Sequence, residues 1–377
     1  MNIFIFGDFC PYDFSSRIQK RAKSFIGEQL YKQISSAEIS ILNLETPLTL
    51  SMNKLDKTGP CIRTNPIWAE LIKNAGFGYV TLANNHIMDY GTQGLRDTLS
   101  VLQKHSIGYV GAGESLEQAS KPLIIQRDSL KIGLLNFADH EYSIAGNDSP
   151  GANPIDIIKN YYAIKQCKSQ VDFLFVIVHG GHEYIEYPGL YYRDLLRFYA
   201  DSGASAVVSH HTHIVSEYEI YNDVPIFYSL GNFYFPWDGN KPDFWYRGIG
   251  VEFTIADNML SFEIIPTTFK NDDNTVEIAD EGEANIILRR LTETNKMITN
   301  DEMLRNWWDG YYRDNALNRI LEFYGTRKVG RLIVRRNKWA QNYLFNRIKL
   351  RRLYHLLNCE SYRDHMKQVL KRILGYN

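Results

Sequence analysis

The chain has 377 residues, of which 44% are hydrophobic and 23% charged, and its formal net charge is −1 at pH 7. This composition excludes a disordered chain, and the nearly zero charge provides no overall attraction to nucleic acid or membrane. The four cysteines are far apart and form no CxxC pair, which argues against a zinc knuckle or a disulfide framework. No apolar run approaches the length of a membrane helix, and residues 1–6 lack the basic flank of a signal peptide. We therefore expect a cytoplasmic protein, either free or peripheral to the inner membrane face.

The first two apolar runs each end in a carboxylate. Residues 2–6 predict a short strand that leads to Gly7 and Asp8, and residues 38–44 predict a second strand that ends at Glu45. Residues 15–36 between them predict a helix. An aspartate at a strand end is often a metal ligand, although Asp8 could instead cap the next segment.

A third predicted strand, 79–82, runs into Asn84, Asn85 and His86, followed by Asp89. The cluster combines a neutral oxygen donor, an imidazole and a carboxylate that could orient the imidazole. A polar turn would explain the asparagines but would leave His86 and Asp89 unexplained, so we favour a functional role. Helices are expected at 66–74 and 92–104, on either side of this segment.

The middle of the chain contains further strand signals and one more candidate ligand. Residues 108–113 predict a glycine-rich turn with no nucleotide role, and residues 122–126 and 131–137 predict a β-hairpin. After an expected helix at 156–169, the most apolar run, 172–178, predicts a strand covered on both faces. This strand delivers His179 as a ligand candidate, and Glu183 follows as a candidate substrate-binding residue.

The richest cluster follows the apolar run 204–209 and contains His210, His211 and His213. Two histidines one residue apart, just beyond a strand, can reach towards one point, and neutral imidazole is a common metal ligand. A chance cluster of surface histidines is the alternative. We assign His211 and His213 as ligands and His210 as a substrate contact. Asn232, after the predicted strand 225–230, either contacts substrate or belongs to a turn.

From residue 283 onward the strand signals stop, and the chain becomes helical and strongly basic. After Gly325 only Glu360 and Asp364 oppose Arg327, Lys328, Arg331, Arg335, Arg336, Lys338, Arg347, Lys349, Arg351, Arg352, Arg363, Lys367, Lys371 and Arg372. This excess suits an anionic membrane surface, an acidic polymer or nucleic acid, while a solvated helix face or a protein interface explains it equally well. No groove-reading motif is present, so we expect no sequence-specific binding of nucleic acid.

Oxygen donors and imidazoles thus occur together at five predicted strand ends. This mixture of donors suits Mn, Zn or Fe, and an acidic residue able to bridge suits a site for two divalent metal ions. Such sites activate water and stabilise charge that develops on a phosphoryl or carbonyl group.

The order of these motifs resembles the calcineurin-like metallophosphoesterase superfamily and, more closely, the CapA family of poly-γ-glutamate capsule biosynthesis. The motifs that carry the resemblance lie within residues 1–266 and include Gly7-Asp8, Asn43-Leu44-Glu45, Asn84-Asn85-His86, His179-Gly180-Gly181, His211-Thr212-His213 and Gly231-Asn232-Phe233. The resemblance implies a four-layer α/β/β/α sandwich, to which we add a helical C-terminal appendage. The expected division is a CapA-like domain at 1–280 and a basic helical region at 281–377.

The resemblance also implies roles for the individual residues. Asp8 and His213 would hold one metal ion, Glu45 would bridge, and Asn85, His179 and His211 would hold the second ion. His86 would be the general acid or would stabilise the transition state, oriented by Asp89. The family pattern of related phosphoesterases, Asp-x-His, is broken here by Cys10, and Glu45 replaces their usual bridging aspartate, so the first metal site is expected to be the weaker one.

These residues predict a metal-dependent hydrolase of a phosphate ester or an amide, related to capsule or poly-γ-glutamate synthesis. Its expected partner is an anionic polymer or a phosphate-containing substrate, with membrane-surface or protein contacts through the basic helices. The alternative is a non-catalytic factor that binds or assembles an anionic capsule polymer.

Overall fold

The computed structural model describes residues 1–12, 25–237, 240–269, 275–323, 334, 337 and 346–374. The chain forms two compact units, Met1–Arg305 and Asn306–Asn377. The first unit therefore includes α8 (Glu281–Ile298), a segment expected from the sequence to belong to the C-terminal region. The domain boundary at residue 280 stays a prediction. Within the described residues, no helix has both the length and the apolar character needed to cross a membrane.

The first sheet is built around four parallel strands. These are β1 (Asn2–Phe9), β2 (Ile39–Leu44), β3 (Tyr79–Thr81) and β4 (Gly108–Val110). Three antiparallel strands extend the sheet beyond β1: β14 (Arg247–Ala256), β15 (Met259–Phe269) and β16 (Val276–Ile278). The order is β16-β15-β14-β1-β2-β3-β4, and β13 (Asn232–Tyr234) pairs in parallel with the end of β1.

The second sheet has the order β11-β12-β10-β9-β7-β6. Its strands are β6 (Leu123–Arg127), β7 (Leu130–Ala138), β9 (Phe173–His179), β10 (Ala206–His210), β11 (Tyr218–Tyr221) and β12 (Val224–Phe227). The inner strands run parallel, whereas β6 and β11 pair antiparallel at the two edges. A two-stranded sheet, β5 (Ala112–Gly113) with β8 (Gly151–Ala152), lies apart from both.

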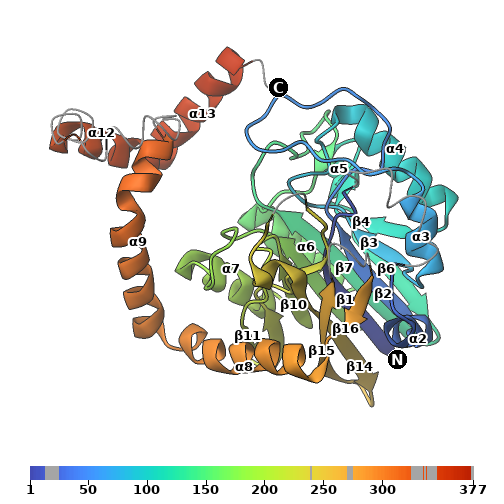
Figure 1. Cartoon of the computed structure of the whole chain (residues 1–377). Coiled ribbons are helices and arrows are strands. Elements are labelled where there is room, and N and C mark those ends of the chain that lie inside the picture. Colours follow the sequence, from blue (N-terminus) through green and yellow to red (C-terminus); the bar gives the residue numbers. More distant parts are fainter. Residues whose placement is uncertain are drawn as a thin grey trace. The chain divides into compact units, whose positions relative to one another are not determined.

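The two sheets stack on each other (Figure 1). The alternation of side chains along their strands explains why. In β1, Ile3 and Ile5 point into a core shared with Phe175 and Ile177 of β9, whereas Phe4 and its neighbour Phe6 point the other way. The outer face of the first sheet is covered by α2 (Glu28–Ser36), α3 (Trp68–Asn74) and α4 (Gly91–Lys104). The outer face of the second sheet is covered by α6 (Ile157–Lys168) and α7 (Leu190–Asp201). The predicted four-layer α/β/β/α sandwich is confirmed.

The remaining helices are short or belong to the C-terminal part. They are α5 (Leu116–Ala119), the 3-10 helix η1 (Asp243–Tyr246), α9 (Asp301–Phe323), α12 (Arg347–Asn358) and α13 (Glu360–Leu374). The predicted helical character of the chain after residue 283 is confirmed for α8, α9, α12 and α13. Residues 15–24 of the predicted helix 15–36 and the basic residues between 327 and 338 lie outside the described residues.

The prediction of a turn at residues 108–113 was wrong, because this segment contains β4 and β5. Gly108 opens β4 because a Cβ at this position would meet the Tyr79 ring of β3 at 2.5 Å. Gly111 separates the two strands and adopts a φ of 96°, which favours glycine. The glycines therefore serve close strand packing and a single sharp bend.

The topology brings the carboxyl ends of the parallel strands in both sheets to one edge. Asp8 of β1 pairs with Asn43 of β2, and His210 of β10 pairs with His179 of β9. In open α/β sheets, this edge is where ligands usually bind. The candidate residues named from the sequence are therefore brought together here.

Candidate metal centre

Two groups of buried side chains in this cluster could each hold a metal ion. One consists of Asp8, Glu45 and His213, and the other of Glu45, His179 and His211. Within each group the ligand atoms lie within 4.8 Å of one another. Glu45 belongs to both groups, so a single carboxylate connects them. The predicted ligand Asn85 lies beside the second group, with its Oδ1 3.1 Å from His179 Nε2.

Glu45 is fully buried, and neither of its side-chain oxygens has a hydrogen-bond partner among the described residues. Its Oε1 lies 3.6 Å from His179 Nε2 and 3.9 Å from His213 Nε2. Burial, followed by the charge of Asp8, raises the pKa of Glu45 well above its usual value. An ionised carboxylate without a partner is costly in an interior, and a cation between Glu45 and the imidazoles would remove that cost. The donor set therefore fits a divalent metal ion.

The three histidines of the two groups favour the neutral form that metal ions bind. Burial lowers the pKa of His211 to about 3, and it also lowers the pKa of His179 and His213 well below the usual value. His211 Nδ1 lies 3.1 Å from His179 Nε2, so the two nitrogens cannot both carry a proton, and at least one of them offers a lone pair at this contact. His211 and His213 also adopt left-handed φ values of 93° and 61°, a backbone strain of the kind found at functional sites.

Asp8, near the end of β1, accepts hydrogen bonds from a residue of β2 and from the segment that carries the three histidines. Asn43 Nδ2 donates to its Oδ1 at 2.7 Å, and the His211 N–H donates to its Oδ2 at 3.1 Å. Burial raises the pKa of Asp8 to about 7, and these hydrogen bonds limit the rise. Asn43 was not chosen as a site residue from the sequence, although its position two residues before Glu45 was the available signal.

Asn232 orients His213 in the structure. Its Nδ2 donates to the Trp245 carbonyl at 3.0 Å, which fixes the amide so that Oδ1 accepts from His213 Nδ1 at 2.9 Å. His213 Nε2 is then left to face Glu45. Asn232 is fully buried, so the structure shows it as an amide that holds a metal-competent histidine, and the predicted substrate contact of Asn232 stays a prediction.

Cys10, which stands where related phosphoesterases have a histidine, lies in the apolar core under the helices of the first sheet. Burial raises the pKa of its thiol well above the usual value. Within the part of the chain that the structure describes, Cys10 belongs to neither metal-competent group. The first group therefore offers Asp8, Glu45 and His213 alone.

His86 faces the cluster from the loop after β3, and Asp89 holds it there. Asp89 Oδ2 lies 2.7 Å from His86 Nδ1 and accepts the Ile62 N–H at 2.8 Å. The other oxygen of Asp89 pairs with Lys57, whose side chain is buried. With its Nδ1–H on Asp89, His86 presents Nε2 towards Glu45 at 4.0 Å. Sequence reasoning missed Lys57, because it lies in a polar loop with no pattern of its own.

The other two predicted substrate residues, His210 and Glu183, differ in their exposure to solvent. His210 is buried, with Nδ1 3.7 Å from Asp8 Oδ1, and neither ring nitrogen has a hydrogen-bond partner among the described residues. Glu183 is exposed at the rim. Glu141, which was not named from the sequence, has Oε1 3.8 Å from His211 Nε2. Although both residues are exposed overall, the surrounding chain partly desolvates their carboxylates, which raises the pKa of both glutamates.

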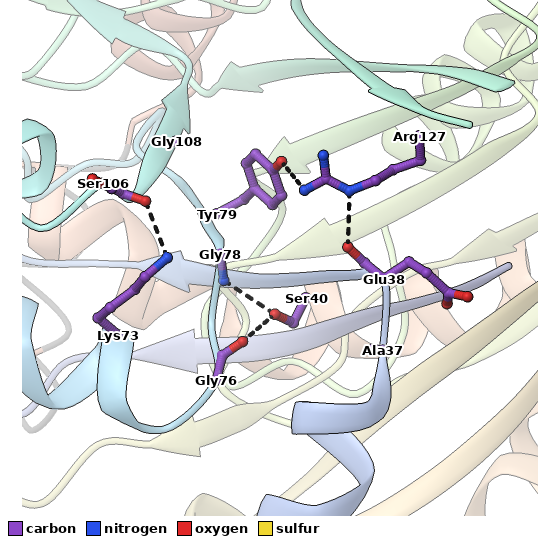
Figure 2. A pocket seen from close by; sticks show the side chains of 10 residues that line it. All are labelled: Ala37, Glu38, Ser40, Lys73, Gly76, Gly78, Tyr79, Ser106, Gly108 and Arg127. Atoms are coloured by element: carbon purple, nitrogen blue, oxygen red, sulfur yellow. Dashed lines mark hydrogen bonds between the residues drawn. The ribbon is translucent and has the colours of Figure 1, made fainter. Parts of the chain in front are cut away.

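A separate hollow lies at the opposite, amino ends of β2, β3 and β4 (Figure 2). Its cationic groups already have internal partners: Lys73 Nζ donates to the Ser106 carbonyl at 3.2 Å, and Arg127 Nη2 donates to the Tyr79 hydroxyl at 3.0 Å. None of the predicted site residues lines it. The candidate site is therefore the cluster at the carboxyl ends of the strands.

The stacked sheets, with paired metal-competent groups at their common carboxyl edge, define the class of protein as an α/β sandwich of the metallophosphoesterase type. The family described as "Bacterial capsule synthesis protein PGA_cap" matches residues 2–236. The chain belongs to this family, and the resemblance to CapA proteins is confirmed.

Three relatives illustrate the similarity. The chain is 37% identical over 198 residues to the PGA biosynthesis protein CapA of Bacillus subtilis (strain 168), which covers 51% of this chain and 52% of that protein. It is 29% identical over 231 residues to the capsule biosynthesis protein CapA of Bacillus anthracis, covering 59% and 55%. It is 28% identical over 215 residues to a probable polyglutamine synthesis accessory protein of Mycobacterium tuberculosis (strain CDC 1551 / Oshkosh), covering 52% and 56%. The chain thus spans about half the length of the curated relatives it matches.

Proposed function

We propose that the protein is a metal-dependent hydrolase that serves the synthesis of an anionic capsule polymer of the poly-γ-glutamate type, and that it cleaves a phosphate ester or an amide. Two of the relatives are a PGA biosynthesis protein and a capsule biosynthesis protein, which supports the capsule connection. The observation that carries the hydrolase proposal is Glu45, a buried carboxylate shared by two groups of metal-competent side chains.

In this proposal Asp8, Glu45 and His213 hold one divalent ion, and Glu45, Asn85, His179 and His211 hold the second, with Mn, Zn or Fe as the metal. When bound, such ions polarise a phosphoryl or carbonyl oxygen and lower the pKa of water. Asn232 and Asn43 keep His213 and Asp8 in place for this task.

His86 is the proposed general acid, and Asp89 is its positioning residue. Asp89 accepts the Nδ1–H of His86, so the proton to be transferred sits on Nε2, the nitrogen that faces Glu45. Lys57 pairs with the other oxygen of Asp89 and so helps to hold this carboxylate in place beside His86.

Elemental analysis of the purified full chain tests the proposal. His211→Ala should bind less metal than the wild-type protein and should lose hydrolysis of a phosphodiester and of a γ-glutamyl amide in the presence of Mn²⁺. His105→Ala, which changes a histidine at the end of α4, is the matched control and should leave both unchanged. Equal metal content in wild type and His211→Ala would refute the assignment of the site.

A non-catalytic role in binding an anionic polymer is the second candidate, and α12 favours it. This helix has no buried residue and exposes Arg347, Arg351 and Arg352. Such a surface suits an acidic polymer or an anionic membrane. Changing these three arginines to glutamate in the full chain should abolish co-sedimentation with poly-γ-glutamate or with phosphatidylserine vesicles. If the wild-type protein sediments with either while showing no hydrolysis, the second candidate replaces the first.

A further inference from the structure

The ammonium group of Lys241 lies among three aromatic rings. Its Nζ is 3.8 Å from the ring centroid of Trp245, 4.6 Å from that of Trp237 and 5.3 Å from that of Tyr184. We call these three rings the aromatic cage. Cation–π contacts of this kind hold a charge by the faces of the rings and use none of the three N–H donors of an ammonium group.

The cage is held in place by the rest of the first unit. The Trp245 side chain is buried, and its Nε1 donates to the Phe235 carbonyl at 2.7 Å. The Tyr184 N–H donates to the Thr212 carbonyl at 2.9 Å. Pro242 follows Lys241 and restricts the backbone before η1. These contacts fix the rings around the Lys241 ammonium group and so restrict where its charge can lie.

The aromatic cage adjoins the first metal-competent group. The ring centroid of His213 lies 4.8 Å from that of Trp245 and 5.7 Å from that of Tyr184. Within the described ranges, no carboxylate forms an ion pair with Lys241, although the charge of Glu183 acts on it from further away. Next to the metal-competent group there is thus a positive charge whose hydrogen-bond donors have no partner among the residues that the structure describes.

We propose that Lys241 is the residue that binds an oxyanion group of the substrate, a phosphate or a carboxylate, beside the Asp8–Glu45–His213 group. The inference rests on the proposed function for the position of the substrate. Charge-assisted hydrogen bonds from an ammonium group to such an anion are stronger than neutral ones, and the cage removes the need to immobilise a flexible lysine on binding. Lys241 would thereby supplement the metal group that lacks the usual histidine at Cys10.

Isothermal titration calorimetry on the full chain with Mn²⁺ tests this proposal. Methylphosphonate and glutarate are the probes, because they present a phosphonate and carboxylates without a hydrolysable bond. Lys241→Met should weaken the binding of at least one probe tenfold or more, and Lys241→Arg should restore most of the affinity because it keeps the charge over the rings. Lys165→Met is the matched control, since Lys165 lies 5.8 Å over the Tyr161 ring on α6, and it should bind as the wild type does.

The two probes separate the two sources of the anion. A loss confined to methylphosphonate identifies a phosphate substrate, and a loss confined to glutarate identifies a carboxylate polymer; either result supports the proposal. Unchanged binding of both probes by Lys241→Met, or the absence of binding to the wild type, overturns it. Metal content should be equal in all variants. Dependence of binding on Lys241 in a protein without hydrolysis would contradict the proposed function and leave this inference standing.

Discussion

Asp8→Asn should stabilise the metal-free protein above neutral pH and at the same time weaken its stabilisation by Mn²⁺. Asp8 is fully buried, and burial raises the pKa of its carboxyl from the usual 3.8 to about 7. The folded state therefore favours the protonated carboxyl, and its contribution to stability is complete below pH 3.8 and is lost as the pH rises through about 7.

The size of this loss follows from the two pKa values. Their difference corresponds to about 4 kcal/mol at 25 °C. Asparagine stays neutral, so the variant does not lose this stability as the pH rises. However, both Asp8 oxygens accept hydrogen bonds, and the amide nitrogen that replaces one of them faces the Asn43 or His211 donor, which costs about 1 kcal/mol. In the presence of a chelator we therefore expect the variant to be more stable than the wild type by about 3 kcal/mol at pH 8, with no gain at pH 4.

Urea unfolding at several pH values, with a chelator or with Mn²⁺, measures both effects. Mn²⁺ at about 100 times its dissociation constant should stabilise the wild type by about 3 kcal/mol and the variant by much less. Asp309→Asn, an exposed change on α9, should leave stability unchanged throughout. A variant less stable than the wild type at pH 8 with chelator would show that the ionised Asp8 carboxylate does not destabilise the fold. Equal stabilisation of both proteins by Mn²⁺ would show that Asp8 is not a metal ligand.

Three further outcomes are expected. Asp89→Asn should lower kcat by about 10²- to 10⁴-fold, because His86 loses the carboxylate that orients it, while elemental analysis shows unchanged metal; a parallel loss of metal would contradict this role. Glu217→Gln should stabilise the protein by up to about 5 kcal/mol at pH 9 and by nothing at pH 4, since burial raises the pKa of Glu217 to about 8 and the wild type loses stability through that pH; pH-independent urea midpoints would argue against it. Phe175→Ala should cost about 3–5 kcal/mol in chemical unfolding, because the buried ring fills the core between the sheets beside Phe253, and a cost below 1 kcal/mol would mean that this core is loosely packed.

Much of the fold could be predicted from local patterns. The apolar runs of β1 and β9 predicted strands because their side chains serve two packed faces, and the structure has strands there. The edge strand β11 and the short β13 were missed. Their residues carry little periodicity. β11 forms a hairpin with β12 across the turn at Asn222 and Asp223, whereas β13 depends on pairing with β1 from the start of the chain.

Two lysines near the site could not be predicted from the sequence. Lys57 and Lys241 lie in loops, where a lysine is ordinarily solvated, and nothing local distinguishes them. Lys57 acquires its role from an ion pair with Asp89, and Lys241 acquires its role from rings at positions 184, 237 and 245. These contacts join segments that are brought together only by folding.

The sequence by itself determined the types of ligand and their place at strand ends. Parallel strands bring their carboxyl ends to one edge, so a carboxylate or imidazole after each strand was enough to predict a common site. Only the tertiary structure decided how those side chains divide. It buried Glu45 between two groups without a hydrogen-bond partner, placed Asn232 behind His213, and put Cys10 into the apolar core. Burial and orientation depend on neighbours distant in the chain, and no local pattern encodes them.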